Sequence, residues 1–370
     1  YCCFKNGNVA NAKNVIRHVA LIEMFSLRKV KKIILNNFNH KSGINCESNT
    51  MRDLLEYHGV KLSEPLIIGL CEGYSFVYLN LKAMGFPFVG GRTKDGWLGK
   101  FSENTGIQFD VRKTTSTKKA WNNLVQPLNQ GKPVGLGVDF YHLEYIPEEE
   151  RIHFVGHVIS ACGYDDNYVY VGERDYQDIQ KISHSSLEKA RSGKVYGMGG
   201  ADNLSFTITE VNKINLQEIL PRVIKSMAQS FMNPPFKGAG YKGIYKFSRE
   251  IKKTWTDIAR KNEFKGCDFK GWGYVASMWD DWGTGGSVFR NPLRDFLKET
   301  LQYVNLPEVK GAYEIYCDVA NRYSKMTDIL RELDEDRNKE DAALEDLSKM
   351  ALNQAKKEEK AMTMLSNIKL

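Results

Sequence analysis

Apolar positions near the N-terminus follow first an extended and then a helical pattern. The run "KKIILNNF", around residue 33, predicts a first strand or its lead-in. From Cys46 onward the apolar residues recur at i, i+3, i+4 and i+7, which predicts a helix with Asn45 as its N-cap and Gly59 as its stop. A second helix is expected from "SEPLIIGL", with Ser63 as its cap.

The stretch that follows carries the pattern of an antiparallel sheet. Strands are expected over 87–91 and 107–114, with a helix over 116–131. Three β-rich runs come next, namely "KPVGLGVDF", "RIHFVGHVISACGY" and "NYVYVGERD". Because only a loop and the tight turn "YDDN" separate these runs, an antiparallel arrangement is favoured over a parallel one.

The second half of the chain reads as mostly helical. After one more strand at "LSFTITEV", amphipathic segments cover 214–232, 242–262, 290–303 and 308–366, and the glycine-rich stretch 282–292 interrupts them. The dense mixed charges of the last segment favour a helical hairpin over a coiled-coil dimer. These patterns predict an α+β chain in three parts: a peripheral or artefactual segment over 1–30, a domain with an antiparallel sheet over 31–178, and a mostly α-helical domain over 179–370.

Composition narrows the class of protein. A length of 370 residues argues for two domains, and 42% hydrophobic with 26% charged residues is ordinary for a globular protein. The net charge of +7 suits an anionic partner such as a carrier protein or a coenzyme, whereas the scattered basic residues disfavour nucleic acid. Apolar runs stay well below the roughly 18 residues that a membrane span needs. Seven widely spaced cysteines without a CxxC pair suit a reducing cytoplasm better than a disulfide framework or a zinc site.

Cys46 is the first candidate for chemistry. A thiol at a helix N-terminus feels the positive end of the helix dipole, which lowers its pKa. His157 is the best candidate for the base, because it lies in an apolar strand beside Gly156. Glu173 and Asp175 follow the next strand, and in an antiparallel pair either acid can return beside the histidine and orient it.

Cys46 and His157 can also be explained as core residues without a catalytic role. Cysteine is among the most buried residue types and is usually inert there, so Cys46 on its own is more often core than catalytic. A lone histidine in a strand is likewise more often a core residue than a base. His153 and His157 are four residues apart, but without an HExxH context they do not predict a zinc site. No metal or redox cofactor is expected.

Several blocks of sequence resemble the butirosin biosynthesis protein H family. They are the stretch "HKSGINCESNTMRDLLEYHG" at 40–59, "LSEPLIIGLCEGYSFVY", "FVGHVISACGYDD" and "KISHSSLEKARS". The stretch "GTGGSVFRNPLRDFLKE" is similar to the helical domain of unknown function that often follows in this family. The resemblance covers roughly residues 32 to 365. It implies a papain-like, bacteriocin-peptidase-like cysteine fold with an N-terminal catalytic helix, followed by that helical domain.

The resemblance also implies acyl transfer in the cytoplasm. Carried over, Cys46 would hold the acyl group as a thioester and His157 would act as the base, while Glu173 stands where related enzymes usually have Asp. His40 lies six residues before Cys46, the interval at which papain-like enzymes place an oxyanion-hole side chain. The implied donor is an acyl carrier protein or coenzyme A thioester, and the acceptor is a small-molecule amine, as in antibiotic-type specialised metabolism.

Two further residues, Glu64 and Tyr74, are candidates for substrate binding. Glu64 either contacts a substrate amine or caps its helix, and a structural role is favoured slightly for Glu64, Tyr74 and Tyr78. Two other classes of function stay open besides the acyltransferase. One is a cysteine hydrolase, an amidase or peptidase that uses the same residues. The other is a non-catalytic binding module, which predicts an unreactive Cys46.

Overall fold

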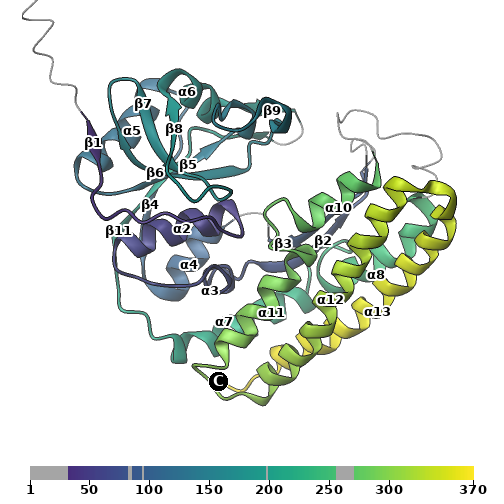
Figure 1. Ribbon diagram of the computed structural model, residues 1–370. Coiled ribbons are helices and arrows are strands. Elements are labelled where there is room, and N and C mark those ends of the chain that lie inside the picture. Colours follow the sequence, from purple (N-terminus) through teal and green to yellow (C-terminus); the bar gives the residue numbers. More distant parts are fainter. Residues whose placement is uncertain (1–31, 82–85, 94–95, 197–198, 256–270) are drawn as a thin grey trace, which may run out of the picture.

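The computed structural model describes residues 32–81, 86–93, 96–196, 199–255 and 271–370. The expected peripheral segment over 1–30 lies outside the described residues. Within them, the chain is α+β, with antiparallel sheets in its first part and mostly helices in its C-terminal part. Figure 1 shows the large sheet at the upper left and the C-terminal helices to the right and below.

The main sheet is antiparallel throughout, as expected, and contains seven strands among the described residues. The pairing of β5 with β6 matches Val138 with His157, and β7 returns along the other side of β6. In sheet order the strands are β4 (Gln108–Arg112), β11 (Ser205–Glu210), β5 (Val134–Val138), β6 (His157–Tyr164), β7 (Tyr168–Gly172) and β8 (Gln180–Ser183), with β1 (Ile33–Ile34) paired to β6.

Helices cover both faces of this sheet. On one face, α2 (Cys46–Tyr57) packs Met51, Leu54 and Leu55 against apolar side chains of β6 and β11. The other face is covered by α5 (Thr117–Asn129) and α6 (His184–Ser192), which form a second apolar cluster with β5 and β6. The predicted helix from Cys46 is confirmed, and its apolar stripe is what fixes α2 on the sheet.

A hairpin extends from the first part of the chain toward the C-terminal helices. Its strands are β2 (Tyr74–Leu79) and β3 (Phe88–Arg92), and β2 packs against α8 (Gly240–Glu250). Sequence reasoning expected β3 but not β2. The hairpin follows α3 (Glu64–Leu70) and precedes α4 (Trp97–Thr105), and in Figure 1 it lies between α2 and the helical part.

The C-terminal part is a helical assembly that shares one apolar core with α2, α3 and the β2–β3 hairpin. Its last two helices pack side by side as the predicted charged hairpin. None of the described helices is both long enough and apolar enough to cross a membrane. The helices are α7 (Leu216–Met232), α8, which continues as the π-helical η3 (Ile251–Trp255), α10 (Trp272–Asp280), α11 (Arg290–Thr300), α12 (Pro307–Glu335) and α13 (Glu340–Ser366).

A buried arginine, Arg290, connects the two parts of the chain. The guanidinium of Arg290, at the start of α11, is 1% exposed and lies 2.8 Å from the carboxylate of Glu358 in α13. It also donates to the carbonyl oxygens of Ser75 in β2 and Val288 at 2.9 and 2.8 Å. Because these acceptors satisfy the buried charge, Arg290 joins α11, α13 and the hairpin into one unit.

Replacing Arg290 should therefore destabilise the whole chain. We expect Arg290→Met to lower the free energy of unfolding by about 3–5 kcal/mol, because the Glu358 carboxylate would stay buried without its cation. Urea unfolding followed by circular dichroism measures this change. Arg322→Met is the matched control, since Arg322 pairs with Asp318 at the surface and should change stability by less than about 1 kcal/mol. Equal effects of the two substitutions would contradict the assignment.

Candidate active site

Cys46 is the first residue of α2, as the sequence predicts. Its neighbour Asn45 caps the helix by accepting the backbone N–H of Glu47 at 3.1 Å. The same side chain donates through Nδ2 to the carbonyl oxygen of Gly283 at 2.8 Å. Cys46 is only 8% exposed, so its thiol lies at the positive end of the helix dipole, beneath a loop from the C-terminal part.

The loop over Cys46 has an unusual backbone. Gly283, Gly285 and Gly286 have positive φ, and so do the next three residues, 287–289. Glycine adopts this left-handed region without the steric cost that a Cβ brings. A Cβ at Gly91 of β3 would lie 2.0 Å from the carbonyl oxygen of Val288. Glycines on both sides therefore allow the loop to lie close to β3 and to the start of α2.

His157 and Glu173 come together through the pairing of β6 with β7. His157 is the first residue of β6, and Glu173 directly follows β7. The ring Nε2 of His157 lies 2.8 Å from Glu173 Oε2, which also accepts from the hydroxyl of Tyr145 at 3.2 Å. The other ring nitrogen is left for the thiol of Cys46, which lies close enough to His157 for the charges of the two groups to interact. The structure thus brings together Cys46, His157 and Glu173.

The charges of these groups stabilise one another. Burial disfavours the thiolate of Cys46, but the adjacent His157 outweighs it and lowers the pKa of the thiol below its ordinary value. Burial also disfavours the imidazolium of His157, yet the charges of Glu173 and Cys46 raise its pKa to about 10. For Glu173 the same partner outweighs burial and lowers the pKa of the carboxyl group. The arrangement therefore shifts the two groups toward a thiolate–imidazolium pair.

Two arginines near the thiol were not identified from the sequence. Arg92, at the end of β3, donates to Glu47 Oε2 at 2.8 Å and to Asn45 Oδ1 at 3.3 Å. Arg174 follows Glu173 directly and lies beside the loop at Gly283, where an added Cβ would be 3.7 Å from its Cζ. After His157, both guanidinium charges lower the pKa of Cys46 further.

His40 does not lie where an oxyanion donor is needed. Its Nδ1 is 2.6 Å from Asp53 Oδ2, and its Nε2 is 3.1 Å from the carbonyl oxygens of both Glu173 and Tyr176. Since all three partners are acceptors, both ring nitrogens carry protons and the ring is cationic. Burial lowers the pKa of His40, but Asp53 outweighs burial and the net change is a rise. The expected donation from His40 to a substrate oxyanion has no N–H left to make it.

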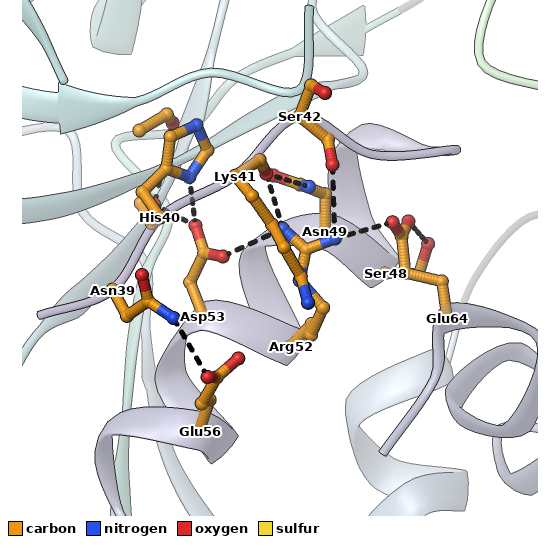
Figure 2. A network of polar contacts seen from close by, with 12 residues as sticks. Asn39, His40, Lys41, Ser42, Ser48, Asn49, Arg52, Asp53, Glu56 and Glu64 are labelled. Carbon is orange, nitrogen blue, oxygen red and sulfur yellow. Dashed lines mark hydrogen bonds and ion pairs between the residues drawn. The ribbon is translucent and has the colours of Figure 1, made fainter. Parts of the chain in front are cut away.

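Glu64 belongs to the same network of polar contacts, which Figure 2 shows from close by. Its carboxylate accepts the backbone N–H of Ile44 and of Asn45 and the hydroxyl of Ser48, at 2.6–3.1 Å. Arg52 bridges Glu64 at 2.9 Å and Asp53 at 3.1 Å. The carboxylate is thus used to hold the chain that leads into Cys46.

The remaining candidates form their polar contacts with residues other than Cys46 and His157. Asp175 pairs with Arg174 at 3.1 Å, while Glu173 is the acid that contacts His157. Tyr74 is 2% exposed, and its hydroxyl donates to the carbonyl oxygen of Pro65 at 3.1 Å.

The structure therefore defines an α+β protein in which a cysteine at a helix N-terminus meets a histidine and a glutamate from neighbouring strands. Comparison with protein families agrees with the resemblance found in the sequence. Residues 45–173 match the family described as butirosin biosynthesis protein H, N-terminal, and residues 185–365 match a domain of unknown function, DUF4872. Residues 45–173 thus carry the N-terminal domain of the butirosin biosynthesis protein H family, and the helical domain follows it, which is the layout that the sequence predicts. No curated protein sequence matches the chain.

The protonation states at Cys46 lead to a first test of the site. We expect Cys46 to react with iodoacetamide below pH 9, because the thiolate is stabilised. We expect His157→Gln to raise the thiol pKa, because burial is then opposed only by Arg92, Arg174 and the helix N-terminus. Once the thiol pKa exceeds the pH, each further unit of that rise lowers the thiolate fraction about tenfold. The pH dependence of alkylation, followed by mass spectrometry of the Cys46 peptide, measures the shift. His58→Gln, a histidine at the far end of α2, is the control, and an unchanged pH profile in His157→Gln would exclude the ion pair.

The cationic ring of His40 leads to a second test. We expect His40→Ala to lower the free energy of unfolding at pH 6 by about 3–5 kcal/mol, because Asp53 loses a buried partner. The folded-state pKa of His40 is raised, so the stabilisation is complete below pH 6.5 and is lost as the pH rises through that pKa. The difference between the wild-type protein and His40→Ala should therefore shrink at high pH in urea unfolding. A difference that grows with pH would show that the ring is neutral.

Proposed function

We propose that this protein is a papain-like cysteine acyltransferase that forms a thioester on Cys46 and passes the acyl group to an amine. The observation that carries the proposal is the contact of His157 Nε2 with Glu173, which leaves the other ring nitrogen for Cys46. A nucleophile, a base and an acid that orients the base are the parts that covalent acyl transfer needs. His157 and Glu173 are buried polar groups beside Cys46, and such a pair supports a role beyond that of an inert core cysteine.

In the first half-reaction, the thiolate of Cys46 attacks the carbonyl carbon of a thioester donor. The carbon–sulfur bond to the donor then breaks, and the protonated His157 gives its proton to the departing thiolate. Glu173 holds the ring in one orientation and stabilises its charge throughout. The products of this step are a free donor thiol and an acyl group bound to Cys46.

The negative charge that develops on the carbonyl oxygen needs donors. The first N–H groups of a helix have no intrahelical acceptor, so the backbone N–H of Cys46 suits this role. The guanidinium of Arg174, beside the loop at Gly283, suits the second donor position that His40 does not fill. In this reading His40 is a positioning residue, because it holds the carbonyl group of Glu173 and not the substrate.

In the second half-reaction, an amine attacks the carbonyl carbon of the thioester and His157 takes up the proton of the amine. The carbon–sulfur bond to Cys46 breaks, which releases the amide and restores the thiolate. Transfer to an amine competes with hydrolysis, so the site must limit water. The contact between Asn45 and the carbonyl oxygen of Gly283 supports transfer, because it places the C-terminal part directly over the helix that carries Cys46. A cysteine hydrolase would use the same three residues with water in place of the amine.

The donor proposed is the thioester of an acyl carrier protein or of coenzyme A. The family name refers to butirosin biosynthesis, which supports a place in specialised, antibiotic-type metabolism. A net charge of +7 favours association with an acidic carrier protein. The acceptor class proposed is a small-molecule amine.

Intact-protein mass spectrometry with a small acyl thioester tests the mechanism. We expect an adduct of one acyl group on the wild-type protein and none on Cys46→Ala. Added amines at millimolar concentration should clear the adduct at least tenfold faster than buffer alone. Cys71→Ala is the matched control, since Cys71 is also a buried free cysteine but burial raises its pKa, and this variant should keep the adduct.

The other outcomes decide between the competing classes. An adduct that buffer clears as fast as amines would establish the hydrolase. If no donor in a broad panel of acyl thioesters labels Cys46, the acyltransferase proposal is wrong and a binding module is favoured.

A further inference from the structure

Three side chains of metal-ligating type meet on the connection between β5 and β6. Asp139, His142 and His153 each offer one ligand atom, and these atoms lie within 4.8 Å of one another. Asp139 directly follows β5, His142 ends the 3-10 turn η1 (Phe140–His142), and His153 lies four residues before β6. The cluster therefore joins the two ends of this connection and has no part in the proposed acyl transfer.

The carboxylate of Asp139 is held in a fixed orientation. It is 1% exposed, and its Oδ1 accepts the backbone N–H of Tyr141 at 3.3 Å and of Phe154 at 2.9 Å. Its Oδ2 faces Nδ1 of His153 at 2.8 Å. Hydrogen bonds to one carboxylate oxygen fix the direction of the other, and metal-binding carboxylates are commonly oriented in this way.

The two histidines make the cluster accessible. The side chain of His153 is 53% exposed and stacks on Tyr141, with ring centroids 4.1 Å apart. Tetrahedral zinc with bonds of about 2.0–2.1 Å separates its ligand atoms by roughly 3.3 Å. The distance from His153 Nδ1 to Asp139 Oδ2 would therefore open by about half an ångström, which an exposed ring stacked on one face allows.

We propose that Asp139, His142 and His153 form a binding site for a zinc-type divalent transition-metal ion. Two imidazole nitrogens and one carboxylate oxygen suit zinc, nickel, cobalt or copper ions, whereas magnesium and calcium prefer oxygen ligands alone. Three protein ligands leave a fourth position on the solvent side for water.

Phe140 places the cluster next to the proposed base, His157. Phe140, between Asp139 and the rest of η1, packs its ring edge-to-face on His157, with centroids 5.0 Å apart at 82°. An ion bound by His142 and His153 would connect η1 to the segment before β6. It would therefore also restrict the position of the Phe140 ring, which contacts His157. Metal binding between β5 and β6 should therefore affect the orientation of the His157 ring toward Cys46.

Isothermal titration of the full-length, tag-free protein with zinc chloride tests the site. The Cys46→Ala background removes the thiol beside His157, which could bind zinc together with that histidine. We expect one zinc ion per chain at this site, and His142→Gln or His153→Gln to weaken its binding by more than about tenfold. Cobalt(II) should give the absorption of a low-coordinate N/O site, and magnesium should not compete.

Two controls keep this test specific. His58→Gln removes a histidine outside the cluster and should leave zinc affinity unchanged. Asp139→Asn keeps an oxygen for the backbone N–H groups of Tyr141 and Phe154, so it should fold while still losing affinity. Equal zinc affinity in the parent and in all three cluster variants would overturn the proposal and leave an ordinary Asp139–His153 hydrogen bond.

Discussion

The candidate site depends on a row of alternating charges that runs from Glu64 through Arg52 and Asp53 to His40. Each member is largely buried, so none of these charges would be stable without the opposite charge beside it. The row begins at the backbone that leads into Cys46 and ends at the carbonyl group of Glu173. It thereby fixes two segments, more than 100 residues apart in sequence, that must meet for thiol, imidazole and carboxylate to align.

The C-terminal part of the chain also holds the start of α2 and covers Cys46. Asn45 caps the helix of Cys46 and also donates to Gly283, so one side chain couples the start of α2 to the loop that covers it. The loop is held in turn by Arg290, which is buried and donates to Val288, Ser75 and Glu358. Because both parts share one apolar core, displacing the C-terminal helices would also displace the cover of the thiol. The domain of unknown function therefore holds the loop that covers Cys46.

Sequence patterns were sufficient where the signal is local. The periodicity after Cys46, with Asn45 as its cap, located α2, and alternation with short turns located the antiparallel strands that bring His157 to Glu173. The strand β2 was not predicted, because its burial depends on helix α8, more than 150 residues later. The arginines near the thiol, Arg92 and Arg174, were missed for the same reason. Nothing in their immediate neighbours shows that distant segments converge on Cys46.

The cations around Cys46 also limit how reactive the thiol becomes. Each unit by which the pKa of a thiol falls raises the thiolate fraction about tenfold while the pKa exceeds the pH, but it lowers the nucleophilicity of the thiolate by about 0.4–0.5 log units. The best attacking thiol therefore has a pKa near the ambient pH. At Cys46, burial raises the pKa whereas His157, Arg92 and Arg174 lower it. Burial therefore keeps the pKa of this thiol higher than the same three cations would set it for an exposed cysteine.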